Sequence, residues 1–142
     1  MKKIKITFQS GKSLFVHLNE DSRTAREIYK MLPFKSEAVH SRWSGREINA
    51  ELPIDQKIPP EDQTIYTSLG EVCYWSNWRR GENEEQKHVI AIYYGAEMTR
   101  SKCGEEPVNV IGRVKECDIE TLTELGEMIW LKGAQKMYME RA

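Results

Sequence analysis

Apolar and polar residues alternate with a period of two from near the amino terminus, and this limits the folds open to the chain. Two six-residue stretches, Lys3–Phe8 and Ser13–Leu18, place an apolar side chain at every second position. Successive side chains on a β-strand point to opposite faces of a sheet, so the period predicts two half-buried strands. The short link Ser10-Gly11-Lys12 between them favours an antiparallel hairpin.

Further stretches have strand-like patterns. Val89–Tyr94 is apolar on both faces, as expected of a strand that is covered on both sides. Gly112, within a predicted strand at Val108–Val114, indicates a bulge or a close backbone contact. The other predicted strands are Val39–Ile48 (interrupted at Gly45), Thr64–Leu69, Val72–Trp75, Met128–Leu131 and Gln135–Met139. We expect loops at Ala50–Glu61, Asn77–Lys87 and Ala96–Pro107.

Two segments carry helix signals. Ser22 is a suitable N-cap for a helix with apolar residues at helical spacing, and Pro33 marks its end. Asp118 is a suitable N-cap for a second, short helix that ends at Gly126.

These patterns predict a mainly β fold with seven to nine short strands and two helices. A closed or nearly closed barrel fits them, because closure removes the exposed strand edges that promote aggregation. The two helices would then cap the barrel openings. A length of 142 residues predicts a single domain over residues 1–142, and a chain of this size buries about 68% of its unfolded surface.

Charge and composition exclude several classes of protein. Lys and Arg total 21 against 22 Asp and Glu, so we expect no nucleic-acid partner held by bulk charge. No apolar run approaches the roughly 18 residues of a membrane span, and the charged start lacks the apolar region of a signal peptide. We therefore expect no membrane partner. Three cysteines without a Cys-x-x-Cys pair favour a reducing, cytoplasmic location.

Known cofactor and metal motifs are missing from the sequence. The three histidines are scattered, without the spacing of a metal site, and there is no phosphate-binding loop, dinucleotide fingerprint or nucleophile elbow. These motifs place ligand groups or nucleophiles at fixed spacings. We expect no metal and no cofactor.

The stretch from His40 to Glu47 is the richest in functional groups. Arginine is suited to bidentate capture of a carboxylate or phosphate, and an indole offers a flat apolar wall. The stretch predicts a pocket for a small anionic or amide-type ligand, with the candidates His40, Arg42, Trp43, Arg46 and Glu47. A carboxylate beside arginine is normally ionised, so Glu47 would act as a base. A solvated turn with an Arg–Glu surface pair, worth less than ~1 kcal/mol, remains an open alternative.

Aromatic residues are adjacent at Tyr74-Trp75 and at Tyr93-Tyr94. Neighbours on a strand face opposite sides, so one residue of each pair should face a cleft, a loop or solvent. Trp75 and Tyr94 are therefore candidates for the pocket lining, although core packing is the more common role of any single aromatic residue.

Three phrases spread over the chain carry a resemblance to known proteins. They are Arg42-Trp43-Ser44-Gly45-Arg46-Glu47, Thr64-Ile65-Tyr66 with Gly70-Glu71-Val72, and Gly133-Ala134-Gln135. Together they resemble a group of uncharacterised prokaryotic proteins of the cyclophilin-like superfamily. The resemblance covers nearly the whole chain and implies a closed eight-stranded β-barrel capped by two short helices.

The resemblance also implies activities. Cyclophilins isomerise X-Pro bonds with an arginine in a Phe-His-Arg run; His40-Ser41-Arg42 is similar, so Arg42 would take that place. The sequence departs from cyclophilins at Lys87-His88-Val89-Ile90-Ala91, which replaces a Gly-Ser-Gln-Phe-Phe phrase. The superfamily also includes barrel domains of bacterial enzymes that act on small cyclic amides, which implies an amide- or carboxylate-type ligand.

Three hypotheses for the function follow. The first is that the chain binds, or binds and transforms, a small anionic or amide-type molecule around Arg42 and Trp43, with Glu47 or His40 exchanging protons. The second is a peptide-binding module or weak peptidyl-prolyl isomerase that uses Arg42. The third is a non-catalytic interaction subunit whose barrel pairs with a partner or with itself as a homo-oligomer.

Overall fold

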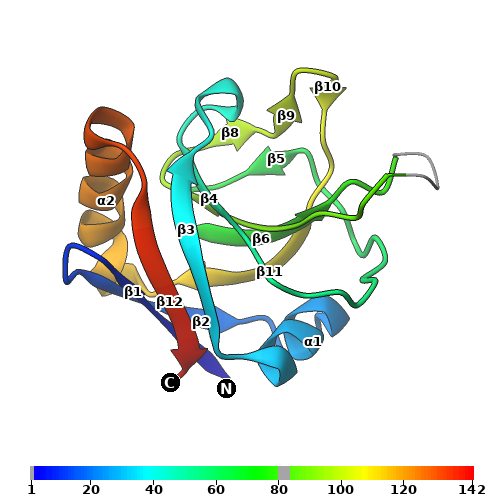
Figure 1. The fold of residues 1–142 in the computed structure, drawn as a ribbon, viewed down its shortest axis with the longest axis horizontal. Coiled ribbons are helices and arrows are strands. Elements are labelled where there is room, and N and C mark those ends of the chain that lie inside the picture. The colour runs from blue at the N-terminus through cyan, green and yellow to red at the C-terminus, as the bar shows by residue number, and fades with distance from the viewer. Residues whose placement is uncertain (1, 80–83) are drawn as a thin grey trace.

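Eight antiparallel strands close into a barrel in the computed structural model, which describes residues 2–79 and 84–142. The order around the barrel is β1-β12-β3-β4-β7-β6-β11-β2 (Figure 1). These strands are β1 Lys3–Phe8, β2 Ser13–Leu18, β3 Phe34–His40, β4 Glu47–Glu51, β6 Glu71–Ser76, β7 His88–Tyr93, β11 Asn109–Val114 and β12 Gln135–Arg141. The prediction of a mainly β, closed eight-stranded barrel with two short helices is confirmed.

The period of two explains how the interior is filled. In β1 and β2 every second side chain is buried, and the pairing of Ile6 with Leu14 shows that the buried residues meet across the hairpin. The apolar side chains that face inward form one large cluster with those of the helices. A smaller cluster of Cys73, Ala91, Tyr93 and Val108 lies apart from it. Strand β7 contributes to both clusters, which is why its sequence is apolar on both faces.

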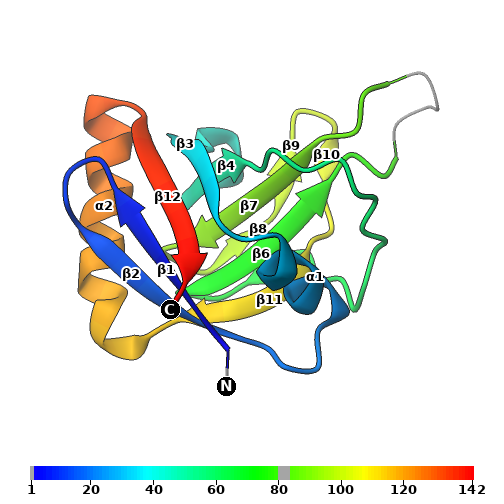
Figure 2. The same ribbon diagram turned by 60° about the horizontal axis from the view of Figure 1, so that its bottom comes forward.

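The helices α1 (Arg23–Met31) and α2 (Ile119–Lys132) add apolar residues to the large cluster. They lie on different sides of the barrel in both views (Figures 1 and 2). The Ser22 hydroxyl accepts a hydrogen bond from the Ala25 N–H at 3.0 Å, so the predicted N-cap of α1 is confirmed. No helix in the described part of the chain is long and apolar enough to cross a membrane.

The second helix corrects two predictions. It runs through Gly126 and ends at Gly133, which has a φ of 101°, so the predicted strand Met128–Leu131 is wrong. Glycine at a positive φ ends a helix well, whereas Gly126 lies mid-helix against Tyr94. Asp118 precedes the helix, but its side chain makes no capping bond and instead accepts one from Phe15 N at 2.9 Å.

Other strand boundaries also differ from the predictions. The predicted strand Val39–Ile48 is two strands, β3 and β4, joined by the 3₁₀ turn Arg42–Ser44. The bulge at Gly112 is confirmed, because the pairing of β11 with β6 shifts between Val110 and Gly112. A Cβ on Gly112 would lie 2.5 Å from the His17 carbonyl oxygen.

Two predicted segments, one strand and one loop, are folded differently. The predicted strand Thr64–Leu69 is reduced to β5 (Tyr66–Thr67), which pairs with β8 (Glu97–Met98). The predicted loop Ala96–Pro107 contains β8 and a second small pair, β9 (Arg100–Ser101) with β10 (Gly104–Glu105). Pairs this short have too few residues for a periodic pattern to reveal them. Residues 80–83 of the predicted loop Asn77–Lys87 lie outside the described residues.

Candidate functional site

A cavity of about 340 Å³ lies on the outer side of the barrel wall. Its floor is formed by β4, β7 and β6, and the turn Arg42–Ser44 and the segment around β9 supply the remaining wall. Figure 1 shows β8, β9 and β10 gathered at this side of the barrel. The lining residues are Val39, Trp43, Ser44, Glu47, Asn49, Glu51, Trp75, Lys87, Val89, Ala91, Tyr93, Thr99, Arg100, Ser101, Glu106 and Val108.

Strand alternation builds the floor of this cavity. Glu47 lies opposite Tyr93 in the β4–β7 pairing, and Glu51 lies opposite Val89 four residues further along. Because every second residue of a strand points to the same face, Glu47 and Glu51 belong to one row along β4. Tyr93 and Val89 form the matching row along β7. Together the two rows form an elongated floor that runs along the strands.

Glu47 is the buried carboxyl of the cavity, only 7% exposed although it lines an open space. Burial raises its pKa, and hydrogen bonds from the hydroxyls of Ser44, Tyr93 and Ser41 lower it less than burial raises it. No arginine contributes to the pKa of Glu47. The expectation that a neighbouring arginine keeps Glu47 ionised is therefore wrong, because the pKa of Glu47 is raised by burial.

Two tryptophans bound the cavity. The Trp75 Nε1 donates a hydrogen bond to Glu106 Oε2 at 3.1 Å, and the Ser101 hydroxyl donates to the other oxygen of Glu106 at 2.8 Å. Glu106 thus connects Ser101 on β9 with Trp75 on the barrel strand β6 through two hydrogen bonds. Trp43 is 57% exposed, so its indole presents apolar surface at the edge of the cavity.

The cavity has two cationic residues that the sequence patterns did not single out. Arg100 is exposed, and its Nε donates to the carbonyl of Trp43 at 3.0 Å. Lys87 is also exposed, and its backbone N–H donates a hydrogen bond to Asn77 Oδ1 at 2.7 Å. Lys87 was assigned to a predicted loop; a period of two through Lys87, Val89, Ala91 and Tyr93 is the sequence signal that could have placed it on this face.

Of the seven candidates from the sequence, Trp43, Glu47 and Trp75 line the cavity. Arg46 does not: its Nε donates to Glu97 Oε1 at 2.7 Å and its guanidinium lies against Gly95.

The other three candidates gather beside α2. The His40 Nε2 and the Tyr94 hydroxyl are 2.6 Å apart, and the His40 ring meets Trp130 edge-on. The Arg42 guanidinium stacks over the Trp130 ring, 4.6 Å from its centroid, and donates to the Trp130 carbonyl. Burial and the nearby Arg42 lower the pKa of His40. The structure therefore divides the predicted pocket into two groups of three residues and leaves Arg46 outside both.

A family profile described as a protein of unknown function (DUF3830) matches residues 9–140. The chain belongs to the DUF3830 family. A comparison with curated proteins finds no match. Among solved structures, McbB in complex with tryptophan has the same fold as the DUF3830 chain, with a TM-score of 0.70 at 19% identity. The match covers 96% of this chain but 44% of that chain, so this chain spans less than half of the McbB length.

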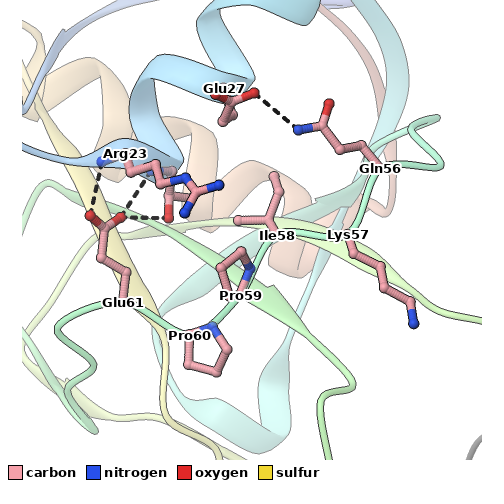
Figure 3. A pocket seen from close by; sticks show the side chains of 9 residues that line it. Arg23, Glu27, Gln56, Lys57, Ile58, Pro59, Pro60 and Glu61 are labelled. Atoms are coloured by element: carbon pink, nitrogen blue, oxygen red, sulfur yellow. Dashed lines mark hydrogen bonds between the residues drawn. The ribbon is translucent and has the colours of Figure 1, made fainter.

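A second hollow of about 250 Å³ lies at the start of α1 in the DUF3830 chain (Figure 3). The Glu61 carboxylate occupies the helix end there, accepting hydrogen bonds from the N–H groups of Arg23 and Thr24, both at 2.9 Å. Across the hollow, Gln56 donates to Glu27 at 3.0 Å. The pKa values of both acids are lowered, by these hydrogen bonds and for Glu27 also by Lys30, whereas burial raises that of Glu47. The cavity around Glu47 is therefore the better candidate for a ligand site.

In residues 2–79 and 84–142, no three His, Cys, Asp or Glu side chains are grouped so that they could hold a metal ion.

Proposed function

We propose that this protein binds a small organic molecule through an amide-type carbonyl group, in the cavity around Glu47. The observation that carries the proposal is a buried carboxyl, with a raised pKa, on the floor of a cavity of about 340 Å³. Pockets of this volume are typical of small-molecule sites, and perturbed carboxyls concentrate in functional sites.

The raised pKa of Glu47 favours its neutral form, and a neutral carboxyl suits an uncharged ligand group. A neutral carboxyl has one O–H donor and remaining acceptor capacity. The hydroxyls of Ser44, Tyr93 and Ser41 already donate to it, so the group left to serve a ligand is its own O–H. An amide carbonyl accepts that hydrogen bond without carrying a charge into the site, whereas a ligand carboxylate would lose hydration there without gaining an ion pair at Glu47.

Apolar surface holds the rest of the ligand. Trp43, Trp75 and Val89 line the cavity, and aromatic side chains contribute large contact areas to small-molecule sites. McbB, whose fold is shared, has been solved with tryptophan. That complex supports the idea that this fold can accommodate a molecule of amino-acid size with a flat ring.

A prolyl isomerase related to the cyclophilin-like superfamily is less well supported. That activity would need Arg42 beside the substrate, whereas its guanidinium binds Trp130 on α2 and does not line the cavity.

The test uses three single-ring probes that differ in their polar group: benzamide, benzoate and benzylammonium. Binding is followed by ¹H–¹⁵N NMR titration at several pH values. We expect benzamide to shift the backbone signals of Ser44, Glu47 and Tyr93, with an affinity that falls as the pH rises through the raised pKa of Glu47. Glu47→Gln, which keeps a neutral donor, should bind benzamide independently of pH, and Glu47→Leu should bind it weakly.

Glu37→Gln is the matched control, because Glu37 is an exposed carboxylate on β3 that does not line the cavity. It should leave benzamide binding and its pH dependence unchanged. The proposal is wrong if benzamide leaves the signals near Glu47 unchanged. It is also wrong if benzoate or benzylammonium perturbs those signals more strongly than benzamide does.

A further inference from the structure

We infer that the cavity selects amides that carry an N–H group, with Asn49 accepting a hydrogen bond from that N–H beside Glu47. The inference rests on the proposed function. It narrows the ligand class to primary and secondary amides and adds a second residue that recognises them. It follows from an amide side chain that lines the cavity with its carbonyl oxygen unpaired.

Asn49 lies in the middle of the cavity floor. It is two residues after Glu47 on β4, so strand alternation places both side chains on the same face. Its partners on the neighbouring strands are Val39 on β3 and Ala91 on β7. All four residues line the cavity. The side chains of Val39 and Ala91 are apolar, so neither can donate a hydrogen bond to Asn49.

The buried hydroxyl of Ser41 fixes the orientation of the Asn49 amide. Asn49 Nδ2 donates a hydrogen bond to Ser41 Oγ, and the Ser41 hydroxyl donates to Glu47. A hydroxyl has a single hydrogen, so Ser41 can donate to Glu47 only if Asn49 presents its NH₂ group to Ser41. The carbonyl oxygen is therefore the end of the Asn49 amide that points away from Ser41.

That carbonyl oxygen is open to the cavity. In the described part of the chain, the bond to Ser41 is the hydrogen bond that the Asn49 side chain makes, and the one fully buried polar side-chain atom without a partner is His40 Nδ1. Asn49 Oδ1 has no partner either, so it must be accessible. Because Asn49 is half-buried and lines the cavity, the open space beside this oxygen is the cavity itself.

Glu47 and Asn49 are close enough to bind one amide group together. Both form hydrogen bonds with the Ser41 hydroxyl, and two atoms that each lie about 2.9 Å from one oxygen are at most about 6 Å apart. A neutral Glu47 supplies an O–H donor, and Asn49 supplies a carbonyl acceptor. An amide with an N–H offers the complementary acceptor and donor on adjacent atoms.

A ligand that lacks the N–H satisfies half of this pair. A tertiary amide, an ester or a ketone can accept from Glu47, but it would displace water from Asn49 Oδ1 without replacing the hydrogen bond. A polar group that loses water and gains no partner reduces the affinity. Asn49 therefore discriminates between carbonyl compounds that Glu47 alone would bind alike.

The test compares benzamide with acetophenone, in which a methyl group of similar size replaces the NH₂ group. Dissociation constants are measured by NMR titration, at the pH of tightest benzamide binding, for wild type, Asn49→Leu and Glu51→Gln. Glu51→Gln is the matched control, because Glu51 is the next residue of the same row and its exposed side chain also lines the cavity. We expect the wild type to prefer benzamide. Asn49→Leu should reduce that preference about fivefold, the equivalent of one hydrogen bond, and Glu51→Gln should retain it. In the wild type, benzamide should also shift the side-chain amide signals of Asn49.

Equal binding of benzamide and acetophenone to the wild type would overturn the inference and leave the proposed carbonyl site at Glu47 standing. A preference that survives in Asn49→Leu, or that disappears in Glu51→Gln, would overturn the inference as well. So would Asn49 side-chain signals that stay unchanged when benzamide binds, and this wild-type measurement decides the matter if Asn49→Leu does not fold. Failure of benzamide to shift the signals near Glu47 would overturn both proposals.

Discussion

The ring of Tyr94 lies directly on Gly126, in the middle of α2. A Cβ built on Gly126 would come within 2.5 Å of Tyr94 Cε1. The contact joins the residue after β7 to the helix beside it, and both neighbouring helix residues Leu125 and Ile129 are buried in the barrel cluster. Glycine is needed here for space and not for its freedom to adopt a positive φ.

Gly126→Ala is therefore expected to destabilise the protein. Alanine is the better helix former by about 1 kcal/mol, but an added methyl group in a filled site typically costs about 1–3 kcal/mol. We expect a net loss of about 1 kcal/mol in the free energy of unfolding, measured by urea denaturation.

A double-mutant cycle with Tyr94→Leu separates the two effects. When the ring is removed, the methyl group of Gly126→Ala has room, and the helix propensity of alanine should make the substitution neutral or stabilising. Equal destabilisation in both backgrounds would show that the contact with Tyr94 is not the reason for the glycine.

Gly126 also shows where pattern analysis of the fold fails. A glycine within an apolar helical pattern can end a helix or make room for a neighbour, and only the tertiary contact distinguishes the two. The prediction that Gly126 ends the helix is the reason why the last two turns of α2 were predicted as a strand. The period of two in β1 and β2 and the capping serine of α1 were reliable because local geometry decides them.

The candidate site was less accessible from the sequence for a different reason. Trp43, Glu47 and Trp75 were singled out by their chemistry, but the companions of Glu47 were sought among its sequence neighbours. The turn Arg42–Ser44 directs Arg42 to α2, and the cavity is completed by Lys87 and Arg100 from distant segments. Spacing along a chain does not reveal groups that only barrel closure brings together.

Glu61→Gln is expected to weaken the start of α1. The Glu61 carboxylate accepts hydrogen bonds from Thr24 N and from the Thr24 hydroxyl, at 2.9 and 2.7 Å. A negative group at a helix start is stabilising by about 1 kcal/mol, less where solvent screens it. Glu120→Gln is the control, because Glu120 is an exposed acid in the first turn of α2, and it should change the free energy of unfolding by a few tenths of a kcal/mol.

The effect of Glu61 should also depend on pH. Burial would raise its pKa, but the hydrogen bonds from Thr24 and Arg23 outweigh burial and lower it. A lowered pKa in the folded state contributes stability above the unfolded value near 4.5 that is lost as the pH falls through the folded value. The stability difference between wild type and Glu61→Gln should therefore shrink in acid, and a difference that stays constant would contradict this account.

Glu47→Gln should have the opposite pH dependence in the ligand-free protein. Burial raises the folded-state pKa of Glu47, so its contribution to stability is present below the unfolded pKa and is lost as the pH rises through the folded value. Glutamine cannot ionise and avoids that loss. Thermal unfolding from pH 4 to pH 8 should show that the unfolding temperature of Glu47→Gln rises relative to that of wild type as the pH rises. A constant difference between the two unfolding temperatures would show that Glu47 is not desolvated.

Glu106→Ala should loosen the β9–β10 pair without unfolding the barrel. It removes the acceptor for both Trp75 Nε1 and the Ser101 hydroxyl. Hydrogen exchange of residues 99–106 should accelerate, because local opening no longer breaks these bonds. In Glu105→Ala the neighbouring exposed carboxylate is removed while the backbone carbonyl that binds Arg79 remains, so exchange should be unchanged. Equal acceleration in both variants would assign the effect to the turn itself.

Arg42→Ala tests whether the arginine of the resemblance belongs to the ligand site. Its guanidinium stacks on the Trp130 ring and donates to the Trp130 carbonyl, and a partly exposed cation–π contact is worth about 0.5–1 kcal/mol. We expect a loss of that size in the free energy of unfolding, with the affinity for benzamide unchanged. Trp130→Leu, which removes the ring that Arg42 covers, should produce a similar loss that is not additive with Arg42→Ala. A large fall in benzamide affinity with Arg42→Ala alone would mean that Arg42 turns into the cavity when a ligand binds. Arg42 would then be a ligand-binding residue after all.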